Sequence, residues 1–146
     1  MEIATCSKGA LAPHSTLDLL LGIEREMKMS PVELPDVQHF IGDGTYCRVM
    51  DVPADTFVMG HMHRGATVTS VLQGCINMLS NHGMEIGIYT AGDVFVTPPE
   101  TKRLWYSALG GQIMTIHATR GLEVNPLDET SMKALQDLVL LTEGEA

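Results

Sequence analysis

The middle of the chain constrains the fold most, because short β-rich runs alternate there with turn-forming residues. Glycine, proline, asparagine and aspartate recur about every 8–12 residues between Thr45 and His117, a spacing typical of all-β domains. The intervals leave no room for the crossover helices that parallel strands need, so the pattern predicts an antiparallel sandwich or barrel. The predicted strands are Tyr46–Val52, Phe57–His63, Thr67–Leu72, Ile76–Leu79, Glu85–Tyr89, Val94–Thr97, Arg103–Ala108 and Gln112–Ala118.

Helical patterns flank this β-rich region on both sides. Apolar residues at helical spacing predict a helix over Thr16–Met29, and a second from about Glu129 to Leu141 with Asp128 as its N-cap. The length suits one domain. We expect three parts within it: an N-terminal segment with a helix (1–44), a barrel (45–122) and a C-terminal helical segment (123–146).

The charge distribution says more about partners than the total does. The 146 residues carry 9 basic and 18 acidic side chains, a net charge of −9, which argues against nucleic acid or an anionic membrane surface as a partner. Residues 1–38 sum to −3, residues 39–122 to −1 and residues 123–146 to −5. The barrel region is therefore nearly neutral and could still present a local cationic pocket to a small anion.

The cysteines and the apolar runs bear on the compartment. The three cysteines, Cys6, Cys47 and Cys75, are far apart and form no Cys-x-x-Cys pair, which fits a reducing compartment rather than a disulfide framework. No apolar run approaches the roughly 18 residues that span a bilayer, and no secretory leader is visible. We therefore expect a cytoplasmic protein with no membrane partner.

A pair of histidines separated by one residue is the first candidate for chemistry. His61 and His63 fall in a predicted strand, where residues i and i+2 project from the same face. Two neutral imidazoles on one face make half of a metal site. The alternative is a hydrogen-bonded or exposed histidine pair with no ligand.

The spacing around this pair resembles the two motifs of the cupin superfamily. His63 is followed by Thr67 and then by Gly74, and Gly92 is followed after five residues by Pro98. The resemblance covers about residues 45–120 and implies a small antiparallel jelly-roll barrel. The chain departs from the motifs at two metal-ligand positions, where it has Thr67 in place of glutamate and Arg103 in place of histidine. An arginine cannot replace a ligand, because its guanidinium has no free lone pair.

The resemblance also suggests a substitute for the missing ligands. In the cupin jelly roll the last strand lies antiparallel beside the strand that begins at Thr67, which would bring His117 close to that residue. His61, His63 and His117 could then hold a divalent ion such as Fe, Ni, Zn or Mn. The alternative is that His117 is a hydrogen-bonded core histidine.

A narrower likeness comes from two short strings near the end of the barrel. Pro98-Pro99-Glu100-Thr101-Lys102-Arg103 followed by Tyr106, and later Thr115-Ile116-His117-Ala118-Thr119, is similar to small cupin-like proteins of tailed bacteriophages and prophages. That likeness would place the protein in the host cytoplasm. It implies no particular reaction.

The cupin frame also predicts a candidate ligand pocket. If residue 103 faces the interior, Arg103 and Trp105 share that face, and arginine suits carboxylate or phosphate groups. Lys102 would then point outward into solvent. The candidate ligand-binding set is Arg103, Trp105, Arg64, Thr67 and Tyr106. The alternative is a structural ion pair between Arg103 and Glu100 or Asp93.

These observations leave three functions open. The first is a barrel pocket for a small anionic ligand, with a divalent metal on the histidines. The second is a metal-dependent dioxygenase, isomerase or lyase acting on a small anionic metabolite. The third is a non-enzymatic oligomerisation module, and in each case we expect a homo-oligomer, with a dimer favoured.

Overall fold

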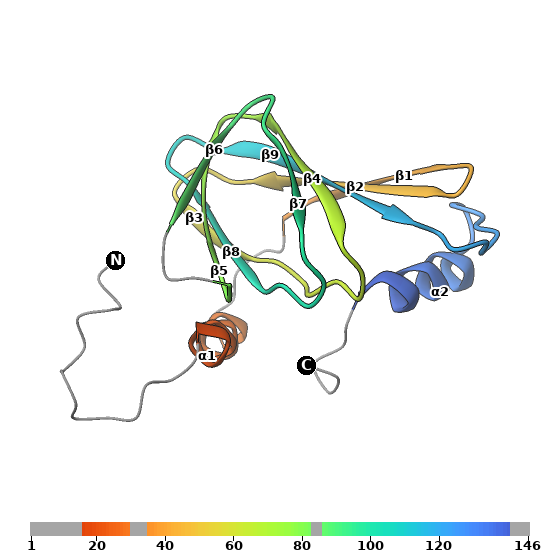
Figure 1. Ribbon diagram of the computed structural model, residues 1–146, viewed down its shortest axis with the longest axis horizontal. Helices are drawn as coiled ribbons and strands as arrows, with labels where there is room; N and C mark the ends of the chain where they lie inside the picture. Colours follow the sequence, from red (N-terminus) through yellow and green to blue (C-terminus); the bar gives the residue numbers. More distant parts are fainter. Residues whose placement is uncertain (1–15, 30–34, 83–85, 141–146) are drawn as a thin grey trace.

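Two β-sheets that face each other form the body of the protein (Figure 1). The computed structural model describes residues 16–29, 35–82 and 86–140. Its elements are α1 (Thr16–Lys28), β1 (Val37–Gly42), β2 (Thr45–Val52), β3 (Thr56–Met59), β4 (Thr67–Gln73), β5 (Cys75–Ser80), β6 (Gly87–Thr90), β7 (Val94–Thr97), β8 (Arg103–Ser107), β9 (Gly111–Ala118) and α2 (Glu129–Val139). Neither of the described helices has the length and apolarity to span a membrane.

The strand order is that of an antiparallel jelly roll. One sheet has five strands in the order β1-β2-β9-β4-β7, and the other has four in the order β3-β8-β5-β6. The paired strands all run antiparallel, and β9 lies between β2 and β4. The antiparallel all-β architecture predicted from the turn spacing, and the flanking helices predicted from helical periodicity, are confirmed.

Two details of the strand prediction were wrong. β1 was not predicted, because in the described structure it is an edge strand that is exposed along most of its length and lacks the alternation of a half-buried strand. The strand predicted over Phe57–His63 is too long, since β3 ends at Met59. The chain leaves the sheet after Gly60, whose N–H donates to the carbonyl of Arg103, and His63 then forms an isolated bridge with Leu140 after α2.

The barrel interior divides into an apolar end and a polar end. The apolar end is a cluster of six buried residues drawn from both sheets: Val52, Val58, Val71, Ile76, Trp105 and Ile113. The polar end holds most of the buried threonines and histidines together with Arg103. Apolar side chains therefore fill only one end of the barrel interior, and polar side chains fill the other.

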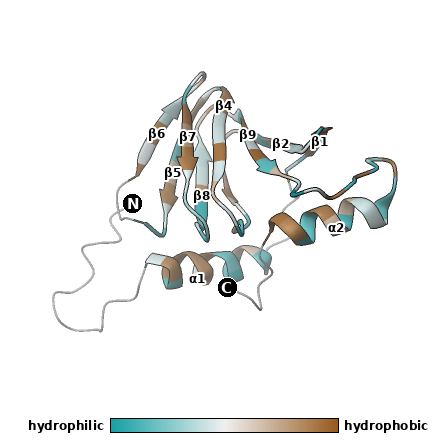
Figure 2. Ribbon diagram, turned by 45° about the vertical axis from the view of Figure 1, so that its right-hand side comes forward, coloured by the Kyte–Doolittle hydropathy of each residue, from teal (hydrophilic) through white to brown (hydrophobic). Residues whose placement is uncertain are grey.

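The two helices cover different parts of the barrel (Figure 2). Leu20 of α1 is fully buried against Leu79 of β5 and Leu104 of β8. Leu135 and Val139 of α2 pack on Tyr46 of β2. The predicted cap of α2 is present, since the Asp128 side chain accepts a hydrogen bond from the N–H of Thr130.

The glycine that follows Thr67 in the cupin-like motif is required by the backbone. Gly74 has φ +85°, and a Cβ at this position would lie 2.5 Å from the carbonyl oxygen of Gly110. It joins β4 to β5 and so carries the chain from one sheet to the other.

Candidate functional site

The polar end of the barrel is built by the register of the five-stranded sheet. Tyr46 of β2 lies opposite His117 of β9, and the next inward-facing position pairs Arg48 with Thr115. On the other side of β9, Thr115 lies opposite Thr69 of β4. Arg48, Thr115 and Thr69 therefore form one cross-strand row that faces the interior.

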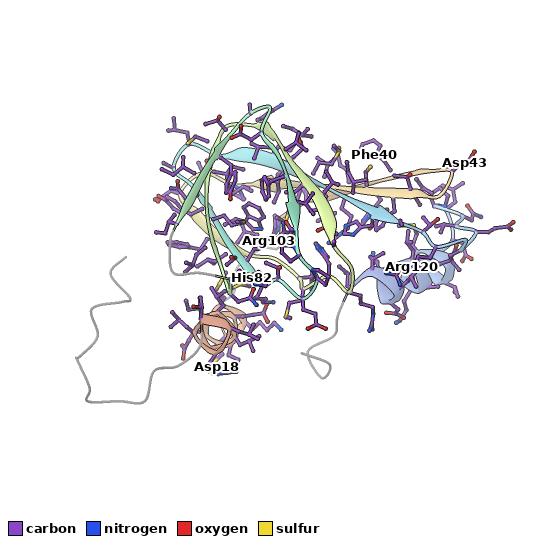
Figure 3. The ribbon with its side chains drawn as sticks, in the orientation of Figure 1. Asp18, Phe40, Asp43, His82, Arg103 and Arg120 are labelled. Carbon is purple, nitrogen blue, oxygen red and sulfur yellow. The ribbon has the colours of Figure 1, made fainter. Side chains whose placement is uncertain are left out.

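Arg103 enters this polar end from the opposite sheet (Figure 3). Its side chain is 2% exposed, and its Nη1 donates to Oγ1 of Thr69 at 2.9 Å and to Oγ1 of Thr97 at 3.1 Å. The guanidinium carbon lies 4.9 Å from the ring centroid of Trp105, which gives a cation–π contact. Arg103, Trp105 and Thr67 of the predicted ligand set are thus all buried within the barrel.

Arg103 carries a buried charge that no described carboxylate neutralises. The predicted alternative pairs are not formed, because Glu100 and Asp93 are exposed and Asp93 accepts from the N–H of Thr90 instead. Within residues 16–29, 35–82 and 86–140 the buried Nε of Arg103 also lacks a hydrogen-bond partner. Burial, followed by the nearby charge of Arg48, lowers the pKa of Arg103 to about 10, so the group stays charged at neutral pH.

His63 and His117 meet at the same end of the barrel. Both are buried, and their ring centroids lie 4.6 Å apart in an edge-to-face arrangement. Nε2 of His117 lies 2.9 Å from the Thr115 hydroxyl. Burial and the charges of Arg103 and Arg48 lower the pKa of His63 to about 2 and that of His117 to about 4. Both imidazoles are therefore neutral at pH 7.

The predicted three-histidine metal site is not assembled. His61 is exposed whereas His63 is buried, because the chain has left β3 and the alternation of a strand no longer applies. The described residues contain no group of three or more His, Cys, Asp and Glu side chains that could hold a metal ion. A divalent cation beside His63 and His117 would also face the charges of Arg48 and Arg103. In this arrangement the described residues bring two imidazoles together, whereas a catalytic site of this kind uses three protein ligands.

Two members of the predicted ligand set lie elsewhere. Arg64 is exposed, and its Nε and backbone N–H donate to the carbonyl oxygens of Asp137 and Val139 at the end of α2. Tyr106 lies on the other face of β8 from Trp105, and its hydroxyl donates to Asp55 at 2.6 Å. Arg64 therefore anchors a helix end, and Tyr106 belongs to the outer surface.

Lys102 was wrongly expected to be solvated. It is 4% exposed and forms an ion pair with Glu24 of α1. The burial of Lys102 could not be predicted from its neighbours in sequence, because α1, which is distant in sequence, covers the face of the barrel on which Lys102 lies.

Arg48 also lies at the polar end of the barrel and was not among the predicted site residues. Arg48 is half-buried, its charge acts on the pKa of Tyr46, and its buried Nε has no hydrogen-bond partner in the described part of the chain. The signal was available, since Arg48 shares its strand face with Tyr46, Met50 and Val52, which alternate through β2. The alternation of Thr67 and Thr69 in β4 could have indicated the hydroxyl lining in the same way.

A cavity of about 50 Å³ opens between α2 and the polar end of the barrel. It is lined by Gly65, Ala66, Thr67, His117, Ala118, Arg120, Leu138 and Val139. A polar cavity of this size has room for a few water molecules or one small anion. Arg120 lies beside α2 in Figure 3, so its guanidinium adds a positive charge to the lining.

Comparison with known proteins gives structural matches only. No family model and no curated protein matches the sequence. Hydroxypropylphosphonic acid epoxidase from S. wedmorenis superimposes with a TM-score of 0.50 and 14% identity, over 59% of this chain and 51% of that chain. An Fe(II) HppE structure in complex with substrate gives 0.51 and 14%, over 60% and 52%. A cupin-2 domain protein from Shewanella frigidimarina gives 0.48 and 12%, over 66% and 91%.

The fold is a cupin-like jelly roll. The chain spans about half the length of the epoxidase structures, and at 14% identity the likeness concerns the fold alone. The similarity to phage-encoded proteins and the cytoplasmic location stay predictions.

Proposed function

We propose that the polar end of the barrel binds a small anionic molecule, with Arg103 as its principal anchor. The observation that supports this proposal is the buried guanidinium of Arg103, which the described residues surround with hydroxyl groups and an aromatic ring but with no carboxylate. A buried charge is costly unless a partner of opposite sign neutralises it. A bound anion would supply that partner.

The chemistry of the neighbouring side chains favours an anion over a cation. The Thr67 hydroxyl and the neutral imidazoles of His63 and His117 can donate hydrogen bonds without bringing a negative charge. Trp105 packs against the guanidinium and is itself fully buried. A small anion that accepts several hydrogen bonds fits this combination.

The second candidate is a metal-dependent dioxygenase, isomerase or lyase. Its support is the adjacent pair of neutral imidazoles, His63 and His117, which are in the protonation state that metal ligation needs. It would require His61, or another ligand, to turn into the barrel. The structural neighbours include Fe(II) and Co(II) forms of HppE, but this likeness concerns the fold.

The test of the anion proposal is thermal unfolding of the full chain in acetate, benzoate, phosphate and sulfate at constant ionic strength. We expect at least one of them to raise the melting temperature in a saturable manner, because a ligand that binds only the folded state stabilises it. Arg103→Met should abolish that rise. If none of the four anions shifts the wild type, or if Arg103→Met keeps the shift, the proposal is overturned.

Metal content measured on the same preparation, purified without a chelating tag, separates the two candidates. The anion proposal expects no stoichiometric metal. One ion per chain that disappears in both His63→Ala and His117→Ala would replace it with the metal-dependent candidate.

We also propose that the protein forms a homodimer through the outer face of its five-stranded sheet. Aligned apolar residues from all five strands cross this face in the described region: Phe40, Cys47, Ile116, Val68 and Val96. Phe40 and Val96 are more than half exposed, which is the kind of surface that interfaces cover. Light scattering during size exclusion would test it, with Val96→Lys expected to shift a dimeric peak to the monomer mass.

A further inference from the structure

We infer that Arg48 is a second anion anchor, and that the pocket selects a doubly charged tetrahedral oxoanion of the phosphate class. The inference rests on the proposed function and deepens it. Arg103 alone would explain affinity for any small anion. Two guanidinium groups that face the same cluster of neutral donors specify the charge of the ligand as well.

The position of Arg48 in the sheet brings it to the same cluster as Arg103. Arg48 lies opposite Thr115, and Thr115 lies opposite Thr69, whose hydroxyl accepts from Nη1 of Arg103. Neighbouring strands are about 4.8 Å apart, so this row brings the two arginines toward each other across only two strand spacings. His117 is one inward-facing position away from Arg48 on the adjacent row.

Both arginines hold hydrogen-bonding capacity that the protein leaves unused. The Nε atoms of Arg48 and Arg103 are the buried side-chain nitrogen and oxygen atoms that lack a hydrogen-bond partner in the described residues. Buried polar groups are normally satisfied, so two such atoms at one end of a barrel are unusual. Arg103 is 98% buried, which makes its unused donor the more costly of the two.

The charge of this end of the barrel indicates a dianion. No carboxylate appears among the buried polar and charged residues of the described structure, which are threonines, serines, histidines, Lys102 and Arg103. Lys102 is already paired with Glu24. A singly charged ligand would leave one guanidinium of the Arg48–Arg103 pair without a counter-charge. A tetrahedral dianion can bind both guanidiniums through separate oxygen pairs and can accept further hydrogen bonds from hydroxyls and imidazoles.

The cavity between α2 and the barrel adjoins this cluster, although Arg48 and Arg103 are not among its lining residues. Its lining includes Thr67, His117 and Arg120, and Thr67 pairs with Thr97, which accepts from Arg103. At about 50 Å³ it suits a small oxoanion better than a large ester. Leu138 and Val139 of α2 form its opposite wall, so a bulky group attached to the phosphate would have to displace the end of that helix.

The experiment compares ligands that share their geometry and differ in charge. Sulfate and methanesulfonate both present tetrahedral sulfonyl oxygens, with two charges and one. Isothermal titration calorimetry at pH 7.5 and constant ionic strength should show that the wild type binds sulfate about tenfold more tightly than methanesulfonate. Arg48→Met should remove most of that preference while leaving methanesulfonate affinity within about threefold. Arg48→Lys should keep part of it, and its melting temperature reports whether the variants fold.

The controls separate this inference from the proposed function. Arg25→Met removes one positive charge from the exposed face of α1 and should leave both affinities unchanged. If the wild type binds both anions equally, or if Arg48→Met keeps the sulfate preference, the inference is overturned and the anion pocket stands. If neither anion binds to the wild type, and acetate, benzoate and phosphate also fail, the proposed function falls as well.

Two further titrations distinguish the sources of the oxoanion. Inorganic phosphate and phenyl phosphate carry the same group with and without an aromatic body. Tighter binding of inorganic phosphate is expected if the cavity keeps the size seen here. Tighter binding of phenyl phosphate would assign the pocket to phosphomonoesters. It would also overturn the expectation that the end of α2 keeps its position.

Discussion

Lys102 and Arg103 are adjacent in sequence, and the protein treats their charges in opposite ways. Lys102 lies in the layer between α1 and the barrel, where it pairs with Glu24. Arg103 lies inside the barrel, where its partners are the hydroxyls of Thr69 and Thr97. Both side chains are almost fully buried, at 4% and 2% exposure.

The difference shows that a buried structural cation needs a carboxylate partner, which the described residues do not supply to Arg103. The chain brings a carboxylate to Lys102 from a helix that is distant in sequence, so its charge is neutralised by folding itself. Among the residues that the structure places, it brings no acid to Arg103. Burying a charge in this way lowers stability, and proteins keep such groups where function requires them.

The largest expected effect is the loss of the acid that neutralises Lys102. Glu24→Gln should lower the free energy of unfolding by about 3 kcal/mol, because removing one partner leaves the other buried and unpaired. Urea denaturation monitored by circular dichroism measures it. Glu26→Gln, on the exposed side of the same helix, is the matched control and should change stability by less than about 0.5 kcal/mol. Equal effects from the two variants would contradict the structural role of the pair.

Replacing Arg103 should change the free energy of unfolding in the opposite direction. Arg103→Met should raise the free energy of unfolding by about 2 kcal/mol in an anion-poor buffer, since an apolar side chain of similar length replaces an uncompensated charge. Thr69 and Thr97 would not be orphaned, because their hydroxyls lie 3.3 Å apart and can bond each other. Urea denaturation in chloride alone is the measurement. A loss comparable to that of Glu24→Gln would show that Arg103 is a structural residue and that the contrast with Lys102 is false.

The sequence predicted the features that depend on local patterning. The turn spacing located β2, β4, β5 and β7 to β9, and the motif position placed Arg103 inside the barrel. The N-cap of α2 followed from Asp128 and the apolar stripe after it. These features are decided by neighbours within a few residues, which a single sequence displays.

The features that escaped prediction depend on contacts between distant segments. Nothing near Lys102 in sequence indicates that α1 will cover it with Glu24. The separation of His61 from His63 follows from where β3 ends, and strand ends are set by tertiary pairing. The alternation of β2 indicates that Arg48 faces inward, but its role depends on Arg103, which enters from the other sheet. The site therefore depends on the way the two sheets face each other, which a single sequence does not show.

The smallest predicted effect concerns the two histidines that lie beside the unpaired arginines. Burial first, then the charges of Arg103 and Arg48, hold the pKa of His63 near 2 and that of His117 near 4. In the unfolded chain both would titrate near 6.5. The unfolded state therefore binds more protons at mildly acidic pH. The stability contributed by the neutral histidines is complete above about pH 6.5 and is lost as the pH falls below it.

Between pH 6.5 and pH 5.5 each histidine should cost about 1 kcal/mol of unfolding free energy. His117→Gln, whose amide can still bond the Thr115 hydroxyl, should remove its share of this dependence. Urea midpoints at closely spaced pH values in chloride buffers give the curve. Ser107→Ala, which changes a buried interior residue that does not titrate, should shift the whole curve and keep its slope. A bound anion should flatten the wild-type curve, because its negative charge favours the protonated imidazoles that the two arginines oppose. A curve whose slope sulfate leaves unchanged would mean that the anion binds away from the histidines. The contrast between Lys102 and Arg103 would then no longer locate the pocket.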